Sequence, residues 1–166
     1  MNLARSSASN SEFGEEEVRD IVIRGYSSVG EIIGVNYSSV QVEAREAIVP
    51  ASGVAVYSIR IELSSGGDYP QTSVASISYR EIDRFISALD KMSATNINSD
   101  RFEFTEVEYE IDTLNVIVFN NDIGSLMVAF SCEGVSVHTG SLYKIIEFQN
   151  LIKKAKDILE KNRITS

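Results

Sequence analysis

The clearest amphipathic pattern in the chain lies between Ser78 and Met92. Apolar residues recur there at the spacing of one face of an α-helix, with charged and polar residues on the other face. Ser78 and Glu81 have the spacing of a capping box, in which both side chains bond to backbone N–H groups of the first turn. The pattern therefore predicts a helix over residues 78–94 with a side-chain cap at Ser78. Its apolar stripe consists of Ile82, Phe85, Ile86, Leu89 and Met92.

Alternating apolar and polar residues before this helix predict antiparallel strands. Residues 40–49 and 54–63 alternate on either side of a turn sequence, which is typical of a hairpin with one solvated face. Glu46 breaks the inward set of the first of these strands, which predicts a bulge or a strand end at that position. Residues 72–77 predict a short third strand that leads into the helix.

The start of the chain lacks a strong pattern. Residues 1–17 are rich in serine and glutamate without periodicity, which predicts a disordered lead before one α+β domain over residues 18–166. Within that domain, Ile21-Val22-Ile23 predicts a short strand or one helical turn. Gly25 and Gly30 are expected to interrupt it.

The second half of the chain repeats the plan of the first. Strand-like segments again precede an amphipathic helix, which here is rich in lysine near its end. We therefore predict an α+β fold of antiparallel meander sheet, either as one sheet or as two meander-plus-helix halves, with each striped helix covering an apolar sheet face. The pattern leaves open whether the halves share one sheet. The predicted elements are strands over 102–111, 114–119, 126–132 and 135–137 and a helix over 141–161.

The stretch SYREIDRFISALDKM, residues 78–92, and the order of elements around it resemble those of small uncharacterised bacterial α+β proteins. The resemblance rests on this one helix. It implies an α+β fold but no substrate, cofactor or catalytic residue.

Composition narrows the classes of function. The formal net charge of −9 opposes general binding to nucleic acid or to an anionic membrane, because both require a positive protein surface. No apolar run approaches the ~20 residues that a membrane-spanning helix needs. Cys132 is the only cysteine, so no internal disulfide can form, which fits a cytoplasmic protein.

The residues of common catalytic sites are scarce. His138 is the only histidine, and it follows Cys132 across a two-residue turn. Alternation places Cys132 on the inward face and His138 on the outward face, so a joint catalytic role is not expected. No metal-ligand spacing and no phosphate-binding glycine pattern is present, and we expect no cofactor.

A row of carboxylates is the most notable polar feature. Glu106, Glu108, Glu110 and Asp112 alternate along one predicted strand, where neighbours on one face lie ~6–7 Å apart. Phe102 and Phe104 have the wrong parity, which predicts a bulge near residue 105. The row is interpreted as a cation site, an acid/base pair, a docking stripe for a basic partner, or a solvated face that discourages edge pairing. We favour the bland interpretation, which is a solvated face or a row that cross-strand Arg or Lys neutralises.

The C-terminal helix has more apolar residues than one buried stripe requires. Ile146, Leu151 and Ile158 lie beyond the stripe, beside lysines. Exposed aliphatic residues rimmed by charge commonly mark a contact surface. The sequence therefore predicts a homodimer that uses this helix.

Three functions remain open from the sequence. The leading one is a non-catalytic protein-interaction module acting through a sheet face or edge, as a homodimer or with another protein. The second is a carrier of a small apolar ligand between the sheet and the C-terminal helix. The third is an enzyme that depends on the carboxylates of residues 106–112.

Overall fold

A computed structural model of the chain describes residues 20–95, 97, 102–121 and 123–163. The predicted lead, residues 1–17, lies outside them. The described chain forms two antiparallel four-stranded sheets in meander order, each followed by an α-helix, which confirms the predicted α+β fold. The two halves therefore form separate sheets. The first contains β1 (Ile23–Ile33), β2 (Ser39–Val49), β3 (Val54–Ser64) and β4 (Thr72–Ser78), with α2 (Ile82–Ala94) after it; the second contains β5 (Glu106–Ile111), β6 (Leu114–Asn120), β7 (Leu126–Cys132) and β8 (Val135–Thr139), with α3 (Tyr143–Asn162) after it.

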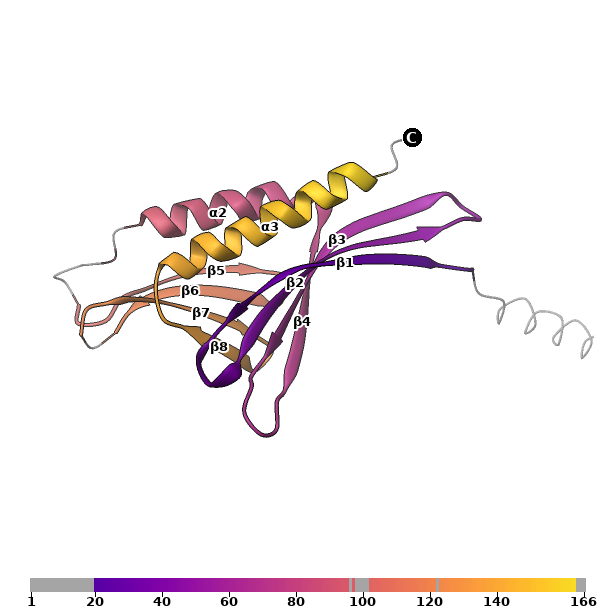
Figure 1. The fold of residues 1–166 in the computed structure, drawn as a ribbon. Coiled ribbons are helices and arrows are strands. Elements are labelled where there is room, and N and C mark those ends of the chain that lie inside the picture. The colour runs from indigo at the N-terminus through magenta and orange to yellow at the C-terminus, as the bar shows by residue number, and fades with distance from the viewer. Residues whose placement is uncertain (1–19, 96, 98–101, 122, 164–166) are drawn as a thin grey trace, which may run out of the picture.

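The two sheets lie at an angle to each other, and the two helices lie side by side across the space between them (Figure 1). Contacts of β3 with β8 and of β4 with β7 join the sheets. Each helix packs mainly against the sheet of the other half, because α3 lies on β1, β2 and β3 while α2 lies against β5. The halves are therefore intertwined, and each depends on the other to cover its apolar face.

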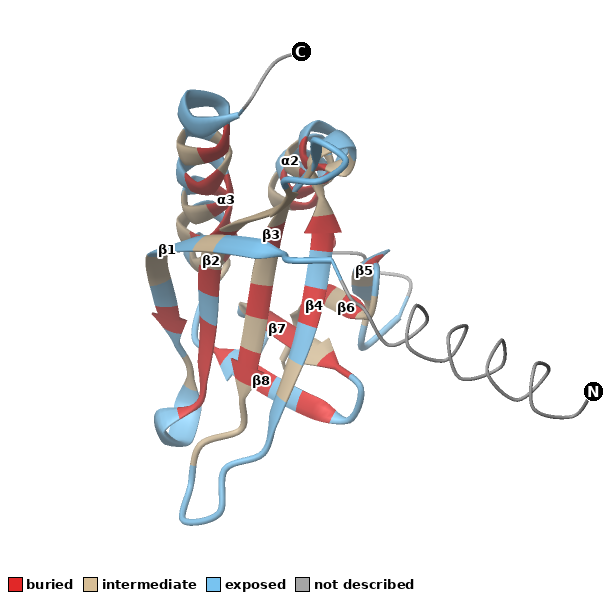
Figure 2. Ribbon diagram, turned by 90° about the vertical axis from the view of Figure 1, so that its right-hand side faces the viewer, coloured by how far each residue is buried: buried red, intermediate tan, exposed pale blue. Residues whose placement is uncertain are grey.

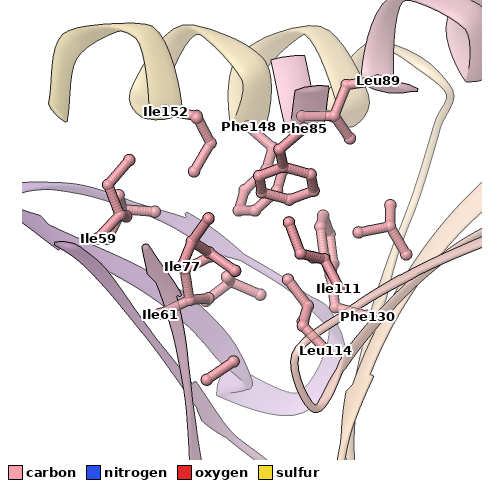
Figure 3. Packing of buried hydrophobic residues seen from close by; sticks show 14 of the residues in the cluster. Ile59, Ile61, Ile77, Phe85, Leu89, Ile111, Leu114, Phe130, Phe148 and Ile152 are labelled. Atoms are coloured by element: carbon pink, nitrogen blue, oxygen red, sulfur yellow. The ribbon is translucent and has the colours of Figure 1, made fainter. Parts of the chain in front are cut away.

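Burial follows the alternation of the sequence. Along β4, buried and exposed residues alternate, and the buried side of α3 faces the sheets (Figure 2). Three fully buried rings from α2, β7 and α3 meet at the centre of the core (Figure 3). Phe148 lies with its ring centroid 5.8 Å from that of Phe85 and 4.8 Å from that of Phe130. This aromatic cluster joins both helices to the second sheet.

The predicted interruption of the first strand is wrong. β1 continues through Gly25 and Gly30, with a shift in its pairing to β2 between Ser28 and Gly30. A Cβ atom at Gly30 would lie 2.7 Å from Cδ2 of Leu151 in α3. Glycine at this bulge therefore makes room for the helix to pack closely on the strand.

Three local predictions also differ from the structure. Glu46 lies within β2, which pairs with β3 without any shift in register. Ser78 makes no side-chain capping bond. A 3-10 turn over Tyr79–Glu81 lies between Ser78 and the start of α2, so Ser78 is not the residue that precedes the α-helix. The strand predicted from residue 102 begins at Glu106, and Phe102 and Phe104 precede it.

No helix of the described chain is long and apolar enough to cross a bilayer.

Candidate functional site at the edge strand β5

β5 is an edge strand of the second sheet. Among the described strands it pairs only with β6, and α2 lies next to it (Figure 1). An edge strand presents backbone N–H and C=O groups that no neighbouring strand satisfies. The position of β5 therefore makes it a template on which another extended segment can pair.

Three predicted carboxylates lie in one row on this strand. Glu106, Glu108 and Glu110 are exposed, and they alternate with the partly buried Val107 and Tyr109. None of the three glutamates has an ion pair within the described residues. Their direct cross-strand neighbours on β6 are Phe119, Ile117 and Asn115, so the alternative that Arg or Lys on this strand neutralises the row does not hold.

Asp112 does not extend the row. β5 ends at Ile111, and Asp112 lies in the following turn with φ of 53°, a conformation that Asp tolerates better than most residues. Its Oδ2 accepts a hydrogen bond of 3.0 Å from the backbone N–H of Ser76 in β4. Asp112 therefore connects the two sheets, in contrast to its predicted place in the stripe.

A surface groove of about 310 Å³ runs between α2 and β5. Ala88, Met92, Val107 and Tyr109 form its apolar part. The ring of Tyr109 stacks on Phe85 with centroids 6.1 Å apart. Arg84 and Lys91 lie on its helical wall and are exposed, without an ion pair inside the described ranges. The full lining is Arg84, Ser87, Ala88, Lys91, Met92, Thr95, Val107, Glu108 and Tyr109.

The opposite side of α2 is occupied by α3. Gln149 Nε2 donates to the carbonyl oxygen of Ile86 at 3.1 Å, and Lys156 Nζ lies 2.6 Å from Asp83 Oδ1. The hydrogen bond to Asp83 raises the pKa of Lys156 above its ordinary value. One side of α2 is therefore fixed by packing on α3, while the side that lines the groove beside β5 is exposed to solvent.

We expect millimolar Ca²⁺ or Mg²⁺ to leave the melting temperature unchanged. The described residues contain no group of three or more His, Cys, Asp or Glu side chains arranged to hold a metal ion. A cation that bound only the folded state would raise the melting temperature. Thermal unfolding followed by circular dichroism checks this, and a rise that disappears in Glu106→Gln/Glu108→Gln would show that the row does bind cations.

The three predicted contact residues of α3 do not form one surface. Ile146 is 40% exposed, whereas Leu151 and Ile158 are half-buried against the chain's own core. Leu151 packs at Gly30 of β1, and Ile158 lines a second groove of about 260 Å³ beside β1 and β2. Only Ile146 therefore has the exposure that a contact with a second copy needs.

Self-association through α3 is tested most cleanly at Ile146. If light scattering reports the dimer that the sequence predicts at micromolar concentration, Ile146→Glu should return it to monomer, because a buried unpaired carboxylate opposes association. Ile146→Leu, which keeps the apolar surface, should remain dimeric. A wild-type chain that stays monomeric at high concentration would contradict the prediction.

Cys132 and His138 lie on opposite faces of the second sheet, as predicted. Cys132 is buried with its Sγ 3.2 Å from the hydroxyl oxygens of Ser73 and Thr113, whereas His138 is exposed and its ring packs against Phe119. The two side chains therefore cannot act on one substrate atom.

The groove was not predicted from the sequence. A signal for it exists in α2, since Arg84, Ala88, Lys91 and Thr95 recur at helical spacing on a side that the apolar stripe does not use. That spacing alone is also typical of an ordinary solvated helix face.

Comparison of the chain with protein-family models and with curated proteins found no match.

Proposed function

We propose that the chain is a non-catalytic protein-interaction module that adds an extended segment of another protein to the free edge of β5. The observation that carries the proposal is the combination of an edge strand with an adjoining groove. In this mode of recognition, backbone hydrogen bonds to the edge provide affinity and side-chain pockets provide specificity. Here β5 would supply the backbone hydrogen bonds, and the groove-lining side of α2 would supply the side-chain pocket.

The groove suits alternate side chains of an added strand. Residues on one face of such a strand would point toward Ala88, Met92 and Tyr109, which offer apolar contact. Residues on the other face would lie beside the glutamate row. One face of a bound segment would thus contact the groove, and the other face would contact the glutamate row.

The two alternative functions have less support. A carrier needs an apolar cavity of roughly 300–1,000 Å³, but Ile152, Ala155 and Leu159 fill the contact between α3 and the first sheet. The groove at Ile158 measures only about 260 Å³ and opens at the surface. For an enzyme, the glutamates of β5 would have to converge on one reacting atom, but they point outward in a row.

Selection of random peptides on the purified chain tests the proposal. We expect the selected peptides to protect the backbone amides of β5 from hydrogen exchange, because an added strand bonds to them. Ala88→Trp, which fills the groove, should weaken their binding about tenfold. Ala94→Trp, on an exposed position of the same helix, is the matched control and should leave binding unchanged. Protection confined to other strands, or equal loss in both variants, would overturn the proposal.

A further inference from the structure

We infer that the segment bound at β5 carries basic residues at alternate positions with apolar residues between them. The inference rests on the proposed function and specifies the chemistry of the partner. It follows from the charges on the two sides of the β5 edge, which are opposite in sign. The outer face carries Glu106, Glu108 and Glu110, while the helical wall of the groove, which Glu108 also borders, carries Arg84 and Lys91.

The outer face selects the basic positions. Side chains of an added strand that point to this face would lie directly beside the glutamates, with Cβ atoms about 4.5–5.5 Å apart. Lysine or arginine at every second position then pairs with the whole row, since both strands have the same side-chain period. A strand with acidic residues there would place like charges opposite each other, which is unfavourable.

The groove side selects the residues between them. These side chains would point toward Ala88, Met92 and Tyr109, where apolar groups lose water on binding. A basic side chain on this side would meet Arg84 and Lys91, neither of which forms an ion pair within the described residues. The two sides together therefore require alternation, and a segment with its lysines grouped together cannot satisfy both.

The same charges oppose β5 of a second copy as the occupant. Antiparallel pairing of β5 with β5 of another copy would bring two glutamate rows together. Charged edge strands are a known means of preventing such pairing. The solvated face predicted from the sequence and the selective binding edge are therefore compatible, because the row repels copies of itself and attracts a basic strand.

Three short peptides test the inference at physiological ionic strength. The first alternates lysine and valine, the second alternates glutamate and valine, and the third groups the lysines and valines of the first into two blocks. Fluorescence anisotropy measures their affinities, and hydrogen exchange reports whether β5 is protected. We expect the lysine–valine peptide to bind at least about tenfold more tightly than the other two and to protect β5. Only this peptide can place a lysine beside each of the three glutamates while its valines point into the groove.

Charge reversal provides the decisive variant. Glu106→Lys/Glu108→Lys/Glu110→Lys should reverse the preference, so that the glutamate–valine peptide binds and the lysine–valine peptide does not. The control Glu31→Lys/Asp68→Lys/Glu133→Lys changes the net charge equally at exposed positions elsewhere and should keep the wild-type preference. This control separates pairing at β5 from general attraction to an acidic protein.

The outcomes distinguish the inference from the function on which it rests. If alternating peptides of either charge protect β5 equally, the module binds strands without charge selection, and the inference fails while the proposed function stands. If the block peptide binds as tightly as the alternating one, the inference fails in the same way. If no alternating peptide protects β5, both are overturned.

Discussion

Phe148→Ala should lower the free energy of unfolding by about 3–5 kcal/mol, the range for removal of a large buried aromatic side chain. Phe148 is fully buried and packs edge-to-face with Phe85 and Phe130. Its loss would leave a cavity where α2, α3 and β7 meet, and close-packed surroundings relax only partly around such a cavity. Urea denaturation followed by far-UV circular dichroism and tyrosine fluorescence measures the change.

The control for this prediction lies on the same helix. Tyr143 is 60% exposed, so Tyr143→Ala should change the free energy of unfolding by less than about 0.5 kcal/mol. We also expect one cooperative transition, because each helix packs mainly on the sheet of the other half. A loss below about 1 kcal/mol for Phe148→Ala would contradict its central position in the core. Two separate transitions would contradict the interdependence of the halves.

The strands and helices were predictable because their apolar periods correspond directly to burial. In β3 the predicted inward set is buried from Tyr57 through Ile59 and Ile61 to Leu63, and its first member, Ala55, is partly buried. In α2 the stripe residues Phe85 and Leu89 are fully buried. Alternation and helical spacing report which side of an element is covered, and they do so from local sequence alone.

The identity of the covering element was not predictable in the same way. An amphipathic stripe indicates that a helix is covered, but it does not identify the sheet that covers it. The exchange of helices between the halves depends on contacts such as Leu151 against Gly30, which are distant in sequence. The glycines of β1 were predicted to interrupt the strand because close packing on a bulge is invisible in a local pattern.

The candidate site was predictable only in part. Parity placed Glu106, Glu108 and Glu110 on one face, but it could not show that β5 is an edge or that α2 leaves a groove beside it. Strand order is a property of the sheet and not of any single strand. Asp112 had the parity of the row, yet a positive φ in the turn directs its carboxylate to Ser76.

The second large effect is expected at the base of the first sheet, where the loop after β3 packs on the 3-10 turn Val35–Tyr37. Gly66 has φ of 69°, and a Cβ atom there would collide with the carbonyl oxygen of Asn36 and lie 2.6 Å from the backbone nitrogen of Ser38. The turn itself has positive φ at Asn36 and Tyr37, and Gly67 donates to the Asn36 carbonyl at 3.2 Å. Both segments are therefore constrained, and neither can shift without breaking these contacts.

Gly66→Ala should lower the free energy of unfolding by about 2–5 kcal/mol, since a left-handed alanine costs about 1–2 kcal/mol and overpacking adds about 1–3 kcal/mol. Gly53→Ala is the matched control, because Gly53 also has positive φ, at 72°, but open space around its Cβ position. It should show only the backbone cost of about 1–2 kcal/mol. Urea denaturation of both variants isolates the collision as their difference. Equal losses would mean that the loop moves away from the 3-10 turn at no cost, contrary to the close backbone packing at Gly66.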